Sequence, residues 1–136
     1  FTLPKFDSDT RKHFVYTDFL DSGFADYSWG VNNKFGLTIT TQIKPGSGLY
    51  LSTTRRIDPT RFAHFFLTLS ADFPANLSLR FKSYDNHLSP IYSVTNGINS
   101  LPLNQSGLTS ISGIIFETNT PVTPVTLTLD NLYFSQ

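Results

Sequence analysis

The amino-acid sequence predicts an all-β fold built from antiparallel strands, arranged as a sandwich or a barrel. Apolar and polar residues alternate with a period of two, and these alternating segments recur about every ten residues. No segment keeps helical periodicity over more than two turns. The chain also has 13 Phe, a residue that favours strands, with 8 Gly and 8 Pro to separate the segments.

The expected strands follow one another from residue 14 to the end of the chain. After a polar segment over residues 1–12, we expect strands at 14–17, 35–40, 49–52, 62–70, 77–84, 92–94, 98–103, 111–116 and 125–134. Loops are predicted at 18–28 and 55–60, and turns at 44–48 and 71–76. With no internal repeat or linker, the 136 residues are expected to form one domain, 1–136.

Alternation also predicts which side chains face away from the core. Tyr50 lies between Leu49 and Leu51, so it is expected on the outer side of its strand. In the strand that starts at Leu77, the outward row comprises Ser78, Arg80, Lys82 and Tyr84. Phe24 is also expected in the core.

The last strand contains an irregularity. Apolar residues occupy odd positions up to Leu129 and even positions from Leu132 onward. Such a slip turns every later side chain to the other face unless an extra residue absorbs it. We therefore predict a β-bulge at Asp130 and Asn131.

Composition excludes several classes of partner. Ten Lys+Arg balance ten Asp+Glu, for a formal net charge of +0, whereas nucleic acids and anionic membranes attract positively charged proteins. Charged residues are only 15% of the chain, which suits a neutral ligand. There is no Cys, and no apolar run approaches the ~20 residues that span a bilayer. Since the chain begins at Phe1 and has no Met, we expect a processed or excised part of a secreted protein.

Catalytic motifs are also missing from the sequence. His13, His64 and His87 do not show the spacing of metal ligands. There is no Gly-x-Ser-x-Gly element of the kind that presents a nucleophilic serine. Glu117 is the only Glu, and no pattern pairs it with an Asp for glycoside cleavage. We predict that the chain has no catalytic residues.

Five segments in order along the chain carry a likeness to known proteins: Val15–Asp18, Gly23–Gly30, Gly48–Leu51, Ser110–Phe116 and Thr126–Leu132. The second segment reads Gly-Phe-Ala-Asp-Tyr-Ser-Trp-Gly. The ordered set resembles jelly-roll carbohydrate-binding modules with a galactose-binding-like fold, and it covers nearly the whole chain. Many members have Trp at the positions of Phe24 and Tyr27.

This resemblance implies a two-sheet jelly-roll sandwich that binds a neutral polysaccharide without cleaving it, with a β-glucan as the first expectation. Aromatic rings stack on the C–H face of a pyranose, and polar groups bond its hydroxyls. The candidate platforms are Tyr27, Trp29, Tyr50 and Tyr84, and the candidate polar partners are Arg80, Lys82, Glu117 and Asn119. Two placements stay open for Trp29, because a lone Trp in a sandwich can also belong to the core. Arg80 and Lys82 can equally be solvated strand residues.

The resemblance also implies a structural calcium ion near the chain termini. Calcium takes six to eight oxygen ligands from carboxylates and carbonyl groups. Asp130 at the predicted bulge is the first candidate ligand, with Asp7 or Asp18 from the opening segment. Alternatively, Asp130 only caps the bulge by accepting hydrogen bonds from backbone N–H groups.

Two other functions stay open. The same outward aromatic residues could dock a structural or adhesion β-sandwich onto a neighbouring domain or protein, and a small hydrolase is a third reading. An exposed aromatic surface lined with polar groups favours sugar binding. A flat apolar patch continuous with the chain ends favours docking.

Overall fold

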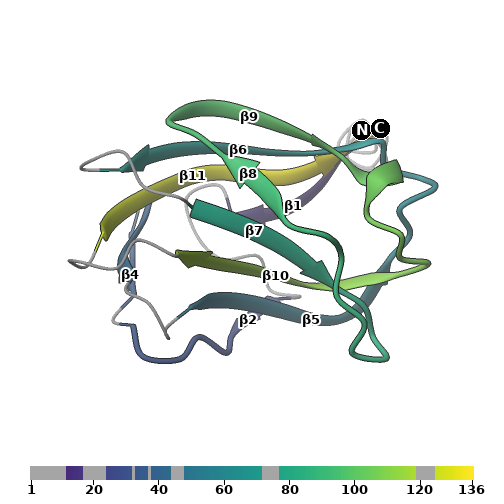
Figure 1. The fold of residues 1–136 in the computed structure, drawn as a ribbon, viewed down its shortest axis with the longest axis horizontal. Coiled ribbons are helices and arrows are strands. Elements are labelled where there is room, and N and C mark those ends of the chain that lie inside the picture. Colours follow the sequence, from purple (N-terminus) through teal and green to yellow (C-terminus); the bar gives the residue numbers. More distant parts are fainter. Residues whose placement is uncertain are drawn as a thin grey trace, which may run out of the picture.

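Two antiparallel β-sheets pack face to face in the computed structural model, which confirms the predicted β-sandwich (Figure 1). The structure describes residues 12–16, 24–31, 33–36, 38–43, 48–71, 77–118 and 125–136. The helical element η1 within these ranges is a short 3-10 turn, Leu103–Gln105. No helix in the described part is long and apolar enough to cross a membrane.

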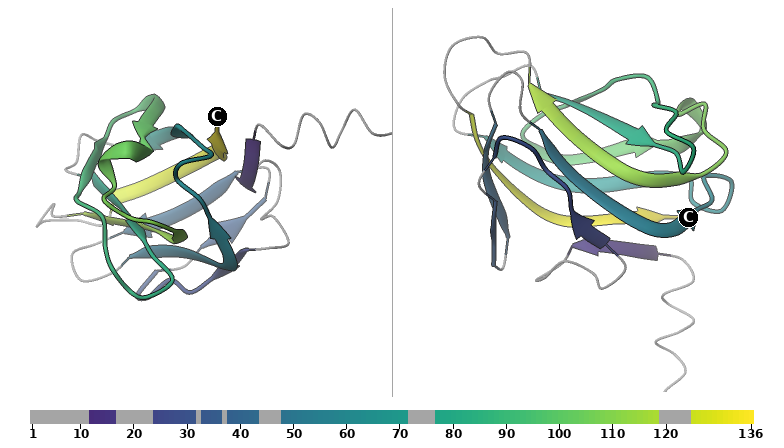
Figure 2. Two further views of the ribbon diagram at one scale, coloured as in Figure 1. Left: turned by 90° about the vertical axis from the view of Figure 1, so that its right-hand side faces the viewer. Right: turned by 90° about the horizontal axis from the view of Figure 1, so that it is seen from below.

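The first sheet is centred on the long strand β11 (Val125–Ser135). Its order is β3 (Lys34–Phe35), β4 (Ile39–Ile43), β11, β6 (His64–Ala71) and β9 (Gly97–Pro102). On one edge, β11 pairs first with β4 and then with β1 (Lys12–Tyr16). The pairing of Lys12 with Ser135 therefore brings the first and last strands side by side in this sheet (Figure 2).

The second sheet has the order β2 (Phe24–Asp26), β5 (Leu49–Ile57), β10 (Ile111–Thr118), β7 (Leu77–Lys82) and β8 (Tyr92–Val94). Its inner face packs on the first sheet, and its outer face is free of other described strands (Figure 2). Alternation decides which residues face each way: along β7 buried and half-buried residues follow one another without a break. The outward placement predicted for Ser78, Arg80 and Lys82 is therefore confirmed, whereas the strand ends before Tyr84.

Phenylalanine rings join the two sheets at the centre of the core. Phe65 of β6 lies 4.8 Å from Phe134 of β11 and 5.5 Å from Phe81 of the opposite sheet, measured between ring centroids. The Phe65–Phe81 pair is edge-to-face, an arrangement that aromatic rings prefer. All three side chains are fully buried, and Phe24 is buried as predicted.

The predicted bulge in the last strand is confirmed. The register between β11 and β6 shifts between Asp130 and Tyr133, and Asn131 has a φ of +50°. Asn tolerates this left-handed backbone better than most residues. The carboxylate Oδ1 of Asp130 accepts the Asn131 N–H at 2.8 Å. The bulge keeps both Leu129 and Leu132 fully buried, so apolar side chains of β11 face the core on both sides of the change of period.

Three sequence predictions about strands and loops are wrong in part. The predicted loop 18–28 contains β2, because the backbone there pairs with β5; tertiary pairing, not local propensity, makes this strand. The predicted loop 55–60 is strand up to Ile57, which pairs with Ile111. The strand predicted at 35–40 is a hairpin: Phe35 pairs with Ile39, and the Gly36 N–H donates to the Thr38 carbonyl at 3.0 Å.

Replacing Phe134 with Ala should lower the free energy of unfolding by about 3–5 kcal/mol, because it opens a cavity between three aromatic neighbours. Urea denaturation measures this change. Ile98→Ala on β9 is the matched control, since Ile98 is 80% exposed and its loss should change stability by less than about 0.5 kcal/mol. Equal losses in the two variants would contradict the described core.

Candidate functional site

The outer face of the second sheet gathers six of the predicted sugar-contacting residues. We call the surface formed by these residues the aromatic face: Tyr27, Trp29, Tyr50, Arg80, Lys82 and Glu117. One row across it follows directly from the strand pairing. The Tyr27 N–H donates to the Tyr50 carbonyl at 2.8 Å, Tyr50 pairs with Ile115, and Ile115 pairs with Arg80.

The Trp29 indole lies on Gly48, its partner across the strands. The two residues exchange backbone hydrogen bonds of 3.0 Å in both directions. A Cβ on Gly48 would lie 2.6 Å from both Cζ2 and Cη2 of Trp29, far closer than real contacts allow. Only glycine therefore lets this ring fold down onto the backbone. Trp29 stays 40% exposed, which places it at the surface and not in the core.

The Tyr50 ring lies on a second glycine in the same manner. Alternation along β5 points Tyr50 outward, as predicted, and its ring leans over the neighbouring strand β10. A Cβ on Gly113 would lie 2.7 Å from Cε1 of Tyr50 and 3.3 Å from its hydroxyl oxygen. Two aromatic rings thus occupy the places where Gly48 and Gly113 lack side chains.

Tyr27 extends the aromatic face at the edge of the sheet. Its ring centroid lies 6.2 Å from that of Tyr50, with the two planes inclined by 48°. Tyr27 is 63% exposed, so its ring makes little contact with the core. Tyr27 and Tyr50 therefore form a pair of neighbouring rings, and Trp29 lies on the same side of the sheet, opposite Gly48.

A network of polar side chains holds Tyr27 and Trp29 against β5. Oδ1 of Asp26 accepts the backbone N–H of Ser28 at 2.9 Å and also its hydroxyl, while Oδ2 accepts the Asn33 amide at 2.9 Å. The Ser28 Oγ in turn accepts the Tyr50 N–H at 2.9 Å. The network spans both strands, so it fixes the segment that carries Tyr27 and Trp29.

The surroundings of Asp26 lower the pKa of its carboxyl. Partial burial raises the pKa of its carboxyl, but the hydrogen bonds from Ser28 and Asn33 favour the charged form and outweigh burial. The pKa of Asp26 is therefore lower than that of a free aspartate. The charged carboxylate stabilises the turn through these hydrogen bonds.

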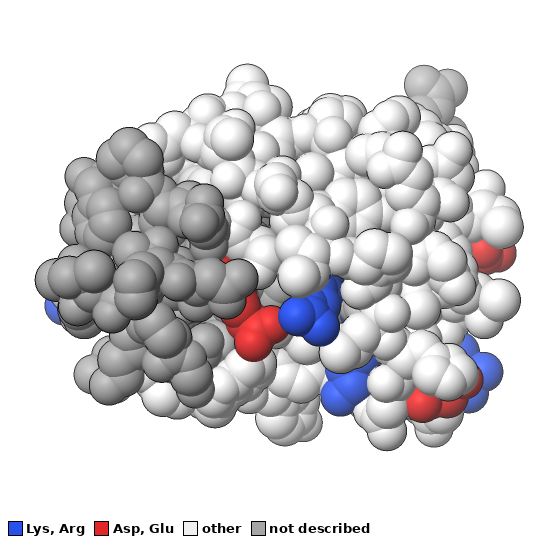
Figure 3. Space-filling model, in the orientation of Figure 1, with Lys and Arg blue, Asp and Glu red and all other residues white. Residues whose placement is uncertain are grey.

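Cationic side chains flank the rings. The Lys82 Nζ lies 5.1 Å from the Tyr50 ring centroid, within range of a cation–π interaction. Nε of Arg80 lies 3.9 Å from Oε1 of Glu117, and this buried Nε makes no hydrogen bond within the described residues. Figure 3 shows that charged side chains are few in this view and gather in its lower part, where Figure 1 places β5, β7 and β10.

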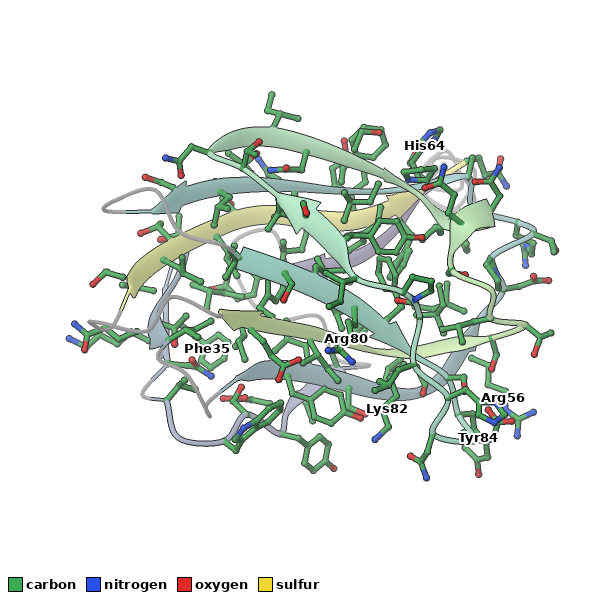
Figure 4. The ribbon with its side chains drawn as sticks, in the orientation of Figure 1. Phe35, Arg56, His64, Arg80, Lys82 and Tyr84 are labelled. Carbon is green, nitrogen blue, oxygen red and sulfur yellow. The ribbon has the colours of Figure 1, made fainter. Side chains whose placement is uncertain are left out.

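Tyr84 lies just beyond the aromatic face, in the turn after β7. It is 58% exposed, and the Arg56 guanidinium carbon lies 4.1 Å from its ring centroid. Figure 4 shows Arg80, Lys82 and Tyr84 following one another, with Arg56 beside Tyr84. Tyr84 thus continues the row formed by Arg80 and Lys82. Arg56, which the sequence analysis did not single out, lies beside it.

Three predicted site residues lie outside the described residues: Asn119, Asp7 and Asp18. The third calcium candidate, Asp130, uses its carboxylate to cap the bulge. Within the described ranges, no three His, Asp or Glu side chains are grouped so that they could hold a metal ion.

Sequence reasoning did not identify the glycines beneath the aromatic rings, or the polar residues that hold the segment with Tyr27 and Trp29. Gly113 interrupts an apolar strand, and an isolated glycine in a strand can signal the close approach of another group. That signal names no partner, so it could not have linked Gly113 to Tyr50. Asp26 and Ser28 form a two-residue hydrogen-bonded turn, but their bonds to Asn33 and Tyr50 depend on strand pairing.

Comparison with family models and with curated protein sequences finds no match for this chain. Solved structures of family 29 carbohydrate-binding modules do match. One variant module has a TM-score of 0.70 at 13% identity, covering 91% of this chain and 90% of that one. A variant complexed with cellulohexaose has a TM-score of 0.69 at 12% identity, covering 91% and 89%. A variant complexed with mannohexaose has a TM-score of 0.69 at 13% identity, covering 91% and 90%. At such identities the similarity shows a shared fold.

Gly48→Ala should displace the indole, because the new Cβ takes the position of the ring. Trp29 is the only Trp in the chain, so its fluorescence reports this movement directly. We expect emission shifted to longer wavelength and a stability change within about 1 kcal/mol. Gly36→Ala is the control, since its Cβ would meet only the Thr38 carbonyl at 4.0 Å. Unchanged emission in Gly48→Ala would show that the ring does not rest on Gly48.

Asp26 should also make folding stability depend on acidity. A carboxyl whose pKa is lower in the folded chain stabilises it above the unfolded pKa of about 3.9, and this stabilisation is lost as pH falls through the folded pKa. Between about pH 5 and pH 2, the wild type should lose more stability than Asp26→Asn. Urea denaturation over this range tests it, and identical pH profiles would refute the described network.

Proposed function

We propose that this chain is a non-catalytic carbohydrate-binding module whose aromatic face binds a neutral polysaccharide, with a β-glucan as the first candidate. One observation carries the proposal: the rings of Trp29 and Tyr50 rest on Gly48 and Gly113 and keep exposed surface on the outside of a sheet. An aromatic ring that rests on backbone is buried on one side, which leaves the other side for a ligand.

The geometry suits a pyranose. Sugar rings have apolar C–H groups on their faces and hydroxyls around their edges, so they need a flat apolar surface with polar groups at its border. Arg80, Lys82 and Glu117 provide donors and acceptors beside the rings. The side chains of Arg80 and Glu117 are 34% and 37% exposed, so their accessible polar ends can meet sugar hydroxyls.

Several rows of side chains favour an extended ligand over a single sugar. The aromatic face runs along β5 and β7 from Trp29 past Tyr50 and Lys82, and Tyr84 continues it. Strand residues on one face are about 6.8 Å apart, so the face offers several successive contacts to a chain. The likeness to modules complexed with cellulohexaose and mannohexaose supports this assignment to oligosaccharides. A relationship with the galactose-binding-like superfamily is part of the same proposal.

Docking to another protein is the second candidate function, and the position of the exposed aromatic residues weighs against it. The aromatic face belongs to the sheet of β2, β5, β10, β7 and β8, whereas the first and last described strands lie in the other sheet. Its rings are bordered by charged side chains and do not form a purely apolar patch.

Secretion and a structural calcium ion stay predictions from the sequence.

Native gel electrophoresis with soluble β-glucans, mannans and xylans in the gel tests the proposal. The wild type should be retarded by at least one of these polysaccharides. Absence of retardation on all of them, together with no heat of binding by calorimetry, would refute sugar binding at this face.

Trp29→Ala should weaken polysaccharide binding at least about tenfold, or about 1.4 kcal/mol, while the fold is kept. The physical reason is the loss of a ring that contacts the ligand and contributes little to the core. Phe35→Ala is a matched control, because Phe35 is 43% exposed but belongs to the other sheet (Figure 4). Calorimetry gives the affinities, and unfolding curves check the fold. Equal affinities of the two variants would exclude Trp29 from the site.

A further inference from the structure

A pocket separate from the aromatic face opens between two connections that link the sheets. One connection runs from β5 to β6 and supplies Pro59 and Thr60; the other runs from β9 to β10 and supplies Leu103, Asn104 and Leu108. The pocket has a volume of about 490 Å³, within the range of small-molecule sites. It is thus large enough for one or two sugar rings.

The pocket has apolar walls. Leu103 is fully buried and anchors η1, while Pro59 and Leu108 are half-buried and form the sides. The backbone around it is tied down: the Leu103 N–H donates to the Ala63 carbonyl at 2.8 Å, and the Ala63 N–H donates to the Ser135 carbonyl at 2.8 Å. The shape is therefore held by hydrogen bonds between three separate parts of the chain.

Together, the polar groups of the pocket offer both donors and acceptors of hydrogen bonds. The hydroxyl of Ser106, which is 2% exposed, accepts the Leu108 N–H at 3.2 Å, and its own proton has no partner within the described residues. The hydroxyl of Thr60 donates to Asp58 at 2.7 Å and keeps an acceptor site. The Asn104 amide makes no hydrogen bond with described residues, and the His64 ring adds two nitrogen atoms to the lining.

This combination matches a neutral, hydroxyl-rich ligand. A sugar hydroxyl also donates and accepts, so it can bond to an amide, an imidazole or another hydroxyl in either direction. No Lys, Arg, Asp or Glu lines the pocket, so it lacks the fixed charge that would select an ion. The apolar walls are suited to the C–H face of a single ring.

We propose that this pocket is a second carbohydrate site, which takes one or two neutral sugar units, either free or at the end of a chain. It shares no residue with the aromatic face, and it is built from the connections between the sheets instead of the outer face of one sheet. Figure 4 shows His64, on its rim, far from Arg80 and Lys82 in that view. The proposal therefore stands whether or not the aromatic face binds polysaccharide.

Nuclear magnetic resonance titration tests the site in the whole chain. We expect at least one of D-glucose, D-mannose, D-galactose, D-xylose and cellobiose to produce saturable shifts at millimolar concentration. The shifts should involve the backbone amides of Thr60, His64 and Gly107 and the Asn104 side-chain amide. The methyl glycosides are titrated in parallel: binding of the free sugar alone assigns the site to reducing ends, and binding of both assigns it to non-reducing ends.

Variants separate the pocket from the aromatic face. Ala63 is exposed and lines the pocket, so Ala63→Trp should fill it and abolish the shifts without unfolding the chain. Ala63→Ser, which leaves the pocket open, is the matched control and should keep them. Asn104→Ala should weaken binding several-fold, whereas Trp29→Ala should leave it unchanged.

Three results would overturn the proposal. The first is the absence of saturable shifts at the pocket with every sugar. The second is binding that persists unchanged in a folded Ala63→Trp variant. The third is a set of shifts confined to Tyr27, Trp29 and Tyr50, which would assign all sugar binding to the aromatic face. Loss of polysaccharide retardation in Trp29→Ala with pocket shifts intact would support two independent sites.

Discussion

Burial of one face of each sheet is the constraint on which the rest of the structure depends. Phe65, Phe81 and Phe134 meet between the two sheets, and strands with a period of two must then point their intervening residues outward. This decides that Tyr50 of β5 and Arg80 of β7 reach the outer face. The bulge at Asp130 serves the same constraint, because it returns Leu132 to the core after the period changes.

Whatever depends on alternation alone could be predicted from the sequence. Tyr50, Arg80 and Lys82 were placed outward because their apolar neighbours had to be buried, and the bulge followed from a slip of one residue. The two-sheet sandwich followed from the same periodicity together with the family resemblance. The features in this class are local in sequence and need no knowledge of which strands are neighbours.

Features that depend on strand pairing could not be predicted. The segment Phe24–Asp26 has weak strand preference and is a strand only because β5 lies beside it. The position of Trp29 stayed open because nothing in the sequence says that Gly48 lies opposite it. The pocket lined by Pro59 and Asn104 joins two connections that are more than forty residues apart, so no local pattern indicates it.

The glycines beneath the rings also have a thermodynamic consequence. Fixing a mobile side chain on association costs about 0.5–1.5 kcal/mol, but rings seated against Gly48 and Gly113 have lost much of that freedom during folding. The aromatic face is in this sense preorganised. A ligand bound at this face would meet a template whose tilt is set by the sheet, and its own twist would have to match that of the strands.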